Sequence, residues 1–104
     1  MNETFKQQVF EIIKMIPKGR VTTYGAIAKA VGFPNYSRHV GNALRNYDED
    51  FPAHRVCSAC GIISAESCIP KFTEKLAKEG VTVKGNKIQN FKQVFWNPLE
   101  EINL

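Results

Sequence analysis

The 104-residue chain lacks features that would place it in a membrane or in an oxidising compartment. No apolar run approaches the roughly 20 residues that a helix needs to cross a bilayer. The first ten residues, MNETFKQQVF, lack the basic-then-apolar layout of a secretion signal. Three cysteines are few and odd in number, which does not suit a disulfide framework. We therefore expect a cytoplasmic protein with free thiols and no membrane partner.

The sequence also contains no internal repeat, no low-complexity segment and no linker. A composition of 43% hydrophobic and 23% charged residues is typical of one globular domain with a modest core. We expect residues 1–104 to form this single domain and to be monomeric. No residue pattern implies a cofactor.

Positive charge is concentrated in the first half of the chain. Residues 1–47 carry seven Lys or Arg and two Glu, a net charge of +5, whereas residues 48–104 carry seven basic and eight acidic side chains. A basic half favours phosphate binding through counterion release. Many solvated helix faces have the same composition, so charge alone indicates nucleic acid only weakly.

Apolar spacing predicts three helices in this basic half. Five residues share one stripe of the first helix, which should end before Pro17: Phe5, Val9, Ile12, Ile13 and Ile16. The second helix should begin after an N-cap at Thr22 or Thr23 and end at Gly32. Its predicted buried stripe is Tyr24, Ile27, Ala28 and Val31.

The third helix is predicted over about residues 37–46 and should carry arginines outward. Its inward residues are Val40, Ala43, Leu44 and Tyr47, and its outward residues are Arg38, Asn42 and Arg45. Two short helices joined by a tight turn, with arginines on the second, form a helix-turn-helix layout. A small helical bundle without DNA binding would show the same periodicity.

Shorter elements are predicted after residue 50. The segments HRVC and GIIS should form a small hairpin around SAC, and a helix near residues 71–79 should end at Gly80. VTVKGNKIQ predicts a second hairpin turning at Gly85-Asn86, a possible wing. Trp96 should pack in the core. The predicted fold class is mainly α with small β-hairpins, a helix-turn-helix or winged-helix-like DNA-binding domain.

Three segments, in order and at matching separations, resemble one known family. They are GRVTTYGAIAKAVG, YSRHVGNALRN and PAHRV, and together with KEGVTV and FWNP they are similar to the C-terminal domain of the O6-alkylguanine-DNA alkyltransferases. In those enzymes the second residue of the PAHRV motif is a nucleophilic cysteine, and here it is Ala53. The chain therefore resembles more closely the alkyltransferase-like proteins, the inert relatives of these enzymes.

The resemblance implies a function in DNA repair: minor-groove binding of duplex DNA that contains O6-alkylguanine, with the lesion flipped out of the stack. Arg38 matches the finger that replaces the extruded base, and Tyr24 matches the tyrosine that crowds the neighbouring phosphate. Without the resemblance, Arg38 would be an ordinary exposed arginine and Tyr24 a core aromatic. The remaining implied DNA-binding residues are Ser37, Gly41, Asn42 and Arg45.

The resemblance also implies a lesion pocket. Its residues are Asn46, Pro52, Ala53, His54, Arg55, Val56 and Ser67. Alkyl transfer needs an activated thiolate, which Ala53 cannot supply and for which Cys57 should lie too far away. His54 then has no thiol to activate and could be a hydrogen-bonded structural histidine. The expected function is lesion recognition without catalysis, followed by hand-off to nucleotide excision repair proteins.

Three other interpretations remain open from the residues. His54, Cys57, Cys60 and Cys68 could form a zinc site of three cysteines and one histidine. The helix-turn-helix could instead belong to a winged-helix regulator that reads sequence in the major groove. A third possibility is an active transferase that uses another residue as acceptor.

Overall fold

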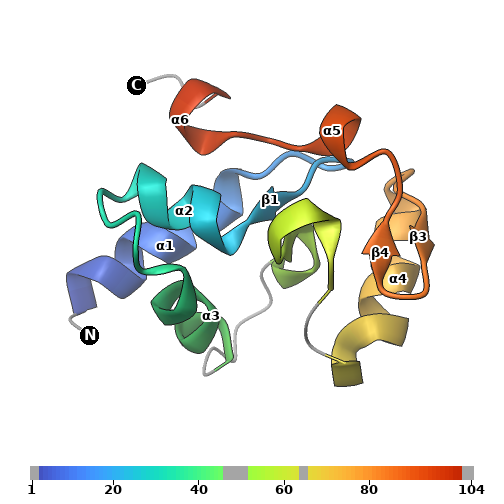
Figure 1. Cartoon of the computed structure of the whole chain (residues 1–104), viewed down its shortest axis with the longest axis horizontal. Coiled ribbons are helices and arrows are strands. Elements are labelled where there is room, and N and C mark those ends of the chain that lie inside the picture. Colours follow the sequence, from blue (N-terminus) through green and yellow to red (C-terminus); the bar gives the residue numbers. More distant parts are fainter. Residues whose placement is uncertain (1–2, 46–51, 64–65, 102–104) are drawn as a thin grey trace.

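The computed structural model describes residues 3–45, 52–63 and 66–101. Helix α1 (Glu3–Met15) ends just before Ile16 and Pro17, where the sequence predicted its end. The five residues of its predicted stripe are all buried, which confirms that prediction. In Figure 1, α1 groups with α2 and α3 on one side of the molecule, and α4 lies with a hairpin on the other.

The next two helices form the predicted helix-turn-helix. Helix α2 (Tyr24–Ala30) begins after Thr23, whose Oγ1 accepts a hydrogen bond from the Ala26 amide at 3.1 Å. Helix α3 (Ser37–Arg45) follows a turn in which Gly32 has a φ of 90°. The N-cap prediction is therefore confirmed at Thr23 and not at Thr22.

One core cluster holds these three helices together. It joins the buried side of α1 to α2, α3 and two later residues, and its buried members are Phe5, Val9, Ile12, Ile13, Ile16, Ile27, Ala28, Val40, Val56 and Trp96. Trp96 is 4% exposed, so its predicted packing is confirmed. Burial of this apolar surface supplies most of the driving force for the helix-turn-helix geometry.

A short parallel strand pair, which the sequence did not predict, connects the helix-turn-helix to the PAHRV segment. Strand β1 (Thr22–Thr23) pairs with β2 (Val56–Cys57) in the register Thr22–Val56 and Thr23–Cys57. Because Thr23 is also the cap of α2, the segment after residue 52 is hydrogen-bonded directly to the start of that helix.

The predicted hairpin between HRVC and GIIS is largely wrong. Ala53–Arg55 form a 3₁₀ turn (η1), and Ala59–Gly61 form another (η2). A single antiparallel bridge, Ser58–Ile62, remains of the hairpin. The physical reason is that β1 offers Val56 and Cys57 a partner strand from far along the chain, which local spacing cannot reveal.

Helix α4 (Ile69–Lys78) follows a 3₁₀ turn, η3 (Glu66–Cys68). It begins before the predicted residue 71 because Pro70 lies in its first turn, where a missing amide hydrogen costs nothing. It ends as predicted, with Gly80 at a φ of 87°.

The predicted second hairpin is confirmed and the end of the chain folds over the first helices. Strands β3 (Val83–Lys84) and β4 (Lys87–Ile88) are antiparallel, with Gly85 at a φ of 63° in the turn. The short helices α5 (Phe91–Val94) and α6 (Pro98–Glu101) were not predicted. A second core cluster packs this half together: Val21, Cys57, Ile63, Leu76, Val81 and Ile88.

Arg20 holds the C-terminal segment in place. Its Nε donates to the carbonyl of Val94 at 3.1 Å and its Nη2 forms an ion pair with Glu101 at 2.9 Å. The amide of Trp96 donates to the carbonyl of Val21 at 2.7 Å. Within the described ranges, no helix is long and apolar enough to span a membrane.

Candidate nucleic-acid interface

Helix α3 presents the polar face that the sequence predicted. Ser37, Arg38 and Asn42 are exposed, whereas Val40 and Ala43 on the opposite side are buried. Arg38 and Asn42 are four residues apart, so their side chains leave the helix on the same face. Leu44 is half-buried against the first core cluster, as predicted. The side chain of Arg45 and the whole of Tyr47 lie outside the described residues.

Gly41 leaves open space on this helix. Apart from the backbone of its own helix and its chain neighbours, a Cβ atom built at Gly41 would meet no atom of the described residues within 4 Å. Packing inside the protein therefore does not require a glycine here, although glycine weakens a helix by about 1 kcal/mol relative to alanine. The small residue instead permits another molecule to approach the helix backbone closely.

Tyr24 is the first residue of α2. The residue is half-buried and packs against the first core cluster. Its structural role as a core aromatic is thus present, and a role at a DNA phosphate requires only the exposed part of the ring. The pairing of Thr23 with Cys57 places Tyr24 directly after the strand contact that leads to the PAHRV loop.

The structure places most of the expected pocket residues in one loop. Pro52 and Ala53 are half-buried at the start of η1, His54 is buried, and Val56 belongs to the first core cluster. Ser67 is exposed in η3, just before α4. Asn46 lies outside the described residues, so its place in a pocket stays a prediction.

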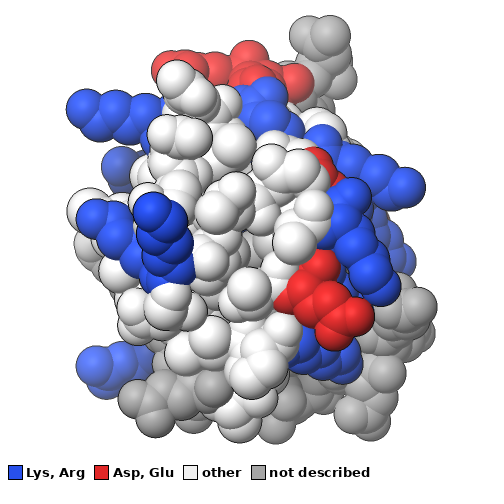
Figure 2. Space-filling model, turned by 90° about the vertical axis from the view of Figure 1, so that its right-hand side faces the viewer, with Lys and Arg blue, Asp and Glu red and all other residues white. Residues whose placement is uncertain are grey.

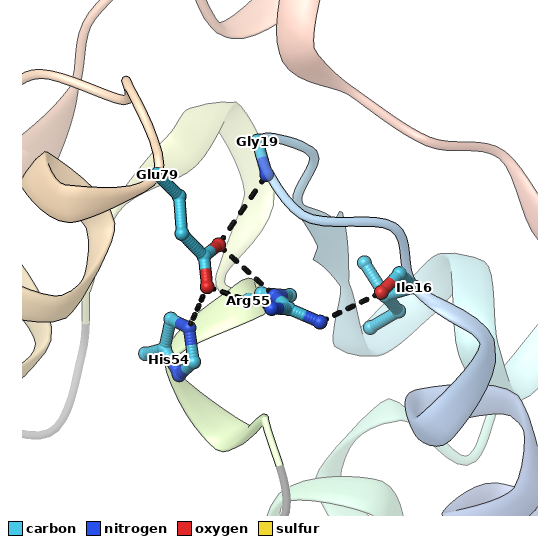
Figure 3. Close-up of polar contacts among 5 residues, drawn as sticks. All are labelled: Ile16, Gly19, His54, Arg55 and Glu79. Atoms are coloured by element: carbon cyan, nitrogen blue, oxygen red, sulfur yellow. Dashed lines mark hydrogen bonds and ion pairs between the residues drawn. The ribbon is translucent and has the colours of Figure 1, made fainter.

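A carboxylate from the end of α4 fastens this loop (Figure 3). Glu79 Oε2 accepts from Arg55 Nη2 at 2.6 Å and lies 2.9 Å from His54 Nε2, while its Oε1 accepts from Arg55 Nε at 3.0 Å. The Gly19 amide also donates to Oε1 at 3.3 Å, and Arg55 Nη1 donates to the Ile16 carbonyl at 2.8 Å. We call these five residues the Glu79 clasp.

Burial and the hydrogen bonds of the clasp together shift the pKa values of Glu79 and His54. Burial alone would raise the pKa of Glu79, but hydrogen bonds from Arg55, His54 and the Gly19 amide hold it at about 2. Burial lowers the pKa of His54 and outweighs the hydrogen bond to Glu79, which acts to raise it. A neutral His54 then donates from Nε2 to Glu79, and its buried Nδ1 has no protein partner in the described structure.

Cys57 is a buried thiol close to the PAHRV motif in the chain. It is 1% exposed, its Sγ donates to the Thr22 carbonyl at 3.3 Å, and burial raises its pKa to about 12. A thiolate is therefore strongly disfavoured at this position. The expected large distance between Cys57 and position 53 assumed that residues 53–57 are extended. That assumption is wrong, because Ala53–Arg55 form the 3₁₀ turn η1. Burial is what makes the Cys57 thiol inaccessible.

The zinc interpretation does not match the arrangement of the thiols. Cys57 is buried, Cys60 is exposed, Cys68 is half-buried, and His54 is occupied by Glu79. Across residues 3–45, 52–63 and 66–101, no three His, Cys, Asp or Glu side chains converge in a way that could hold a metal ion.

Sequence reasoning missed Glu79, although a signal was present. An acidic side chain at the C-terminal end of a helix opposes the helix dipole, so it is unfavourable unless another partner stabilises it. Glu79 directly follows Lys78 at the end of α4, before Gly80. A basic residue in the PAHRV loop was the natural candidate for that partner.

Positive charge alone does not single out α3. On the face formed by α4 and the hairpin, basic side chains flank a band of uncharged residues (Figure 2). The described lysines of these elements are Lys71, Lys75, Lys78, Lys84 and Lys87. The candidate interface is therefore defined by the exposed polar face of α3 and by the open position at Gly41, in addition to charge.

Comparison with known proteins agrees with this arrangement. Residues 4–81 match the family described as 6-O-methylguanine DNA methyltransferase, DNA binding domain. The chain is 39% identical over 99 residues to a DNA base-flipping protein of Vibrio parahaemolyticus, covering 92% of this chain and 99% of that protein. It is 31% identical over 105 residues to alkyltransferase-like protein 1 of Schizosaccharomyces pombe, covering 92% and 97%.

The fold is shared with a solved complex. The crystal structure of Schizosaccharomyces pombe Atl1 with damaged DNA containing O6-carboxymethylguanine superposes with a TM-score of 0.81 at 29% identity, over 94% of this chain and 99% of that one. The chain belongs to the 6-O-methylguanine DNA methyltransferase DNA-binding domain family and, within it, to the alkyltransferase-like proteins.

Proposed function

We propose that this protein recognises O6-alkylguanine in duplex DNA, flips the lesion into a pocket and marks it for repair without transferring the alkyl group. The observation that carries the proposal is the pairing of an exposed α3 face with a rigidly held loop whose acceptor position is Ala53. A relative of nearly the same length is named for base flipping, and the alkyltransferase-like relative Atl1 was solved on damaged DNA.

Each expected residue has a place in this mechanism. Arg38 enters the stack and fills the gap left by the flipped nucleotide, because a planar guanidinium can stack and hydrogen-bond at once. Tyr24 bears on the neighbouring phosphate and helps to rotate the nucleotide. Ser37, Gly41, Asn42 and Arg45 complete the groove-facing helix. Flipping costs a few kcal/mol of stacking, and alkylation reduces that cost by weakening the base pair.

The lesion pocket is proposed to consist of the PAHRV loop with Asn46 and Ser67. Ala53 presents a methyl group where the methyltransferases have their acceptor cysteine. The Glu79 clasp holds Pro52 and Ala53 in place before DNA arrives, so little ordering entropy is lost on binding. Because position 53 carries an alanine and not a nucleophile, the lesion stays intact and another system must remove it. We propose nucleotide excision repair proteins as that downstream partner, with the protein acting as a cytoplasmic monomer.

The proposal is tested by equilibrium binding to matched duplexes that contain guanine, O6-methylguanine or a bulkier O6-alkylguanine at one position. Tighter binding to the alkylated duplexes, together with increased fluorescence of a base analogue beside the lesion, is the expected result. Equal affinity for all duplexes, with preference for a particular sequence, would instead support a winged-helix regulator.

The absence of catalysis is tested by intact-mass measurement. After incubation with excess O6-methylguanine duplex, the protein mass should be unchanged, and Cys57, Cys60 and Cys68 should be unmodified. A stoichiometric gain of one methyl group would show that another residue accepts the alkyl group and that the protein is a transferase.

A further inference from the structure

Four aromatic side chains form a cluster at the entrance to α3. Tyr36 and His39 are stacked with ring centroids 4.4 Å apart, and Phe33 stacks on Tyr36 at 5.0 Å. Phe5 of α1 meets Phe33 and Tyr36 edge-on at 5.6 and 5.7 Å. Contacts from three elements therefore fix the positions of the rings: Phe5 lies on α1, Phe33 and Tyr36 lie in the turn between α2 and α3, and His39 lies on α3.

The cluster is ordered yet remains largely open to solvent. Phe33 is 44% exposed and Tyr36 is 39% exposed, whereas Phe5, which supports both rings, is 5% exposed. The Tyr36 backbone is also fixed, since its amide donates to the Phe33 carbonyl at 2.9 Å and its carbonyl accepts from the Val40 amide at 3.0 Å. Ordered apolar surface that the core does not use is typical of an interaction site.

The position of the stack relative to Arg38 identifies the surface to which it belongs. His39 directly follows Arg38, and at about 100° per residue it projects from α3 between the inward face and the face of Arg38. Tyr36 lies one turn before His39, beneath its ring. The stack therefore borders the face that carries the proposed finger.

The charge around the stack favours a polyanion as its occupant. No Asp or Glu occurs between Glu11 and Asp48, whereas six Lys or Arg residues do. Arg20 is paired with Glu101, but Arg38 is exposed on the face that the stack borders, so this surface combines exposed aromatic rings with positive charge, which is the combination that binds nucleic acid through stacking and phosphate contact.

We propose that the Tyr36–His39 stack is a non-ionic DNA contact that packs against the sugar and base edges of the strand beside the flipped nucleotide. This inference rests on the proposed function and adds to it a second wedge next to Arg38. An aromatic ring that rests on a base or sugar releases no counterion, so its contribution persists at high salt, where phosphate contacts weaken.

Binding by Tyr36→Ala, Tyr36→Phe and His39→Ala tests the proposal, with Leu99→Ala as the control. Leu99 is 59% exposed and lies on α6, at the opposite end of the molecule from α3 in Figure 1. Titrations use O6-methylguanine and guanine duplexes at several salt concentrations. Tyr36→Ala should weaken binding about tenfold with an unchanged salt slope, which is the size expected for one lost stacking contact. His39→Ala should weaken it less, and Tyr36→Phe and Leu99→Ala should bind like the wild type.

A direct readout separates contact from altered folding. Wild-type protein labelled with fluorotyrosine carries reporters at Tyr24, Tyr36 and Tyr47, and Tyr36→Phe assigns the Tyr36 signal. That ¹⁹F signal should shift on saturation with duplex. A signal that does not move, or affinity of Tyr36→Ala and His39→Ala within twofold of the wild type, overturns the proposal. Dimerisation that Tyr36→Ala abolishes, with DNA affinity unchanged, also overturns it and assigns the surface to a second copy. Whether wild-type protein prefers the lesion is read from the same titrations, so failure of the proposed function is recognised separately.

Discussion

The α3 face and the PAHRV loop use their polar residues in opposite ways. On α3, Arg38 and Asn42 are exposed and the backbone is held from behind by buried Val40 and Ala43. In the loop, Arg55 turns inward, its side chain is 12% exposed, and it is bound to Glu79. The α3 face leaves the Arg38 charge accessible to a partner, whereas the Arg55 charge in the loop is neutralised by Glu79 and fixes the loop backbone.

This difference suits the α3 face to binding a charged partner and the PAHRV loop to holding its residues in a fixed position. An exposed arginine such as Arg38, on a helix supported by apolar packing, can exchange water for phosphate or base without loss of fold. A loop fixed by a buried ion pair and its hydrogen bonds cannot adapt in this way, but it presents Pro52 and Ala53 in one geometry. The following predictions test this division.

Glu79→Ala should have the largest effect, on stability. It leaves the Arg55 charge and the His54 ring buried without their shared partner, and breaking a buried pair in this way costs about 3 kcal/mol or more. Urea unfolding measures the loss. Glu74→Ala is the matched control, because Glu74 faces Lys78 at 3.6 Å on the exposed side of α4 and should change stability by less than about 1 kcal/mol. Similar losses in both variants would show that the clasp is not a stabilising element.

Acid should weaken the clasp by a smaller amount than removal of Glu79, because protonation keeps the side chain in place. The pKa of Glu79 falls from 4.5 to about 2 on folding, so its contribution is complete above pH 4.5 and is lost as pH falls toward 2. The pKa of His54 is lowered from 6.5, so stability also declines below pH 6.5, where the unfolded state binds the proton more readily.

Unfolding by urea at pH values from 7 to 3 measures this decline. Glu79→Gln should show a shallower slope below pH 4.5 than the wild type, because the variant has no carboxylate to protonate there. Glu74→Gln should retain the wild-type slope. If Glu79→Gln keeps that slope as well, other carboxylates are responsible for acid sensitivity.

On the α3 face, Arg38→Ala should reduce discrimination and leave folding nearly intact. Without a guanidinium to fill the gap, the affinity ratio of O6-methylguanine to guanine duplex should fall by about tenfold, the size of one good contact. Arg45→Ala should weaken both duplexes alike and lower the salt slope by about one charge, as expected of a phosphate contact. Equal weakening of both duplexes by Arg38→Ala, with unchanged base extrusion, would contradict the finger assignment.

The extent of successful sequence prediction differs between the same two regions. The helix-turn-helix could be predicted because its signals are local: the α1 stripe, the Thr23 cap and the α3 faces all repeat at helical spacing. The hairpin of Val83–Ile88 was likewise encoded by its turn, at Gly85.

The PAHRV loop was predicted less well because long-range partners determine its structure. Glu79 is more than twenty residues from Arg55 in the chain, and β1 is still further from β2. No periodicity relates such segments, so local spacing predicts a hairpin arm for this loop and does not connect the loop to Glu79. The resemblance located the motif, but the role of the clasp came from geometry.

The smallest predicted effect is that of Gly41→Ala, a single substitution that should change protein stability and DNA affinity in opposite directions. Among the described residues, a Cβ built there would have no neighbour within 4 Å apart from its own helix backbone and its chain neighbours, so Gly41→Ala should stabilise the fold by up to about 1 kcal/mol through helix propensity. If α3 enters a groove as proposed, the added methyl group should hold the backbone away from DNA and weaken binding severalfold. Urea unfolding and duplex titration of the same protein measure the two effects. Gly61→Ala shows the opposite behaviour and serves as the contrast, since its φ is 84° and its Cβ would lie 2.9 Å from Phe91, so it should destabilise the fold. Higher stability of Gly41→Ala with unchanged DNA affinity would show that the groove does not approach the helix at this position.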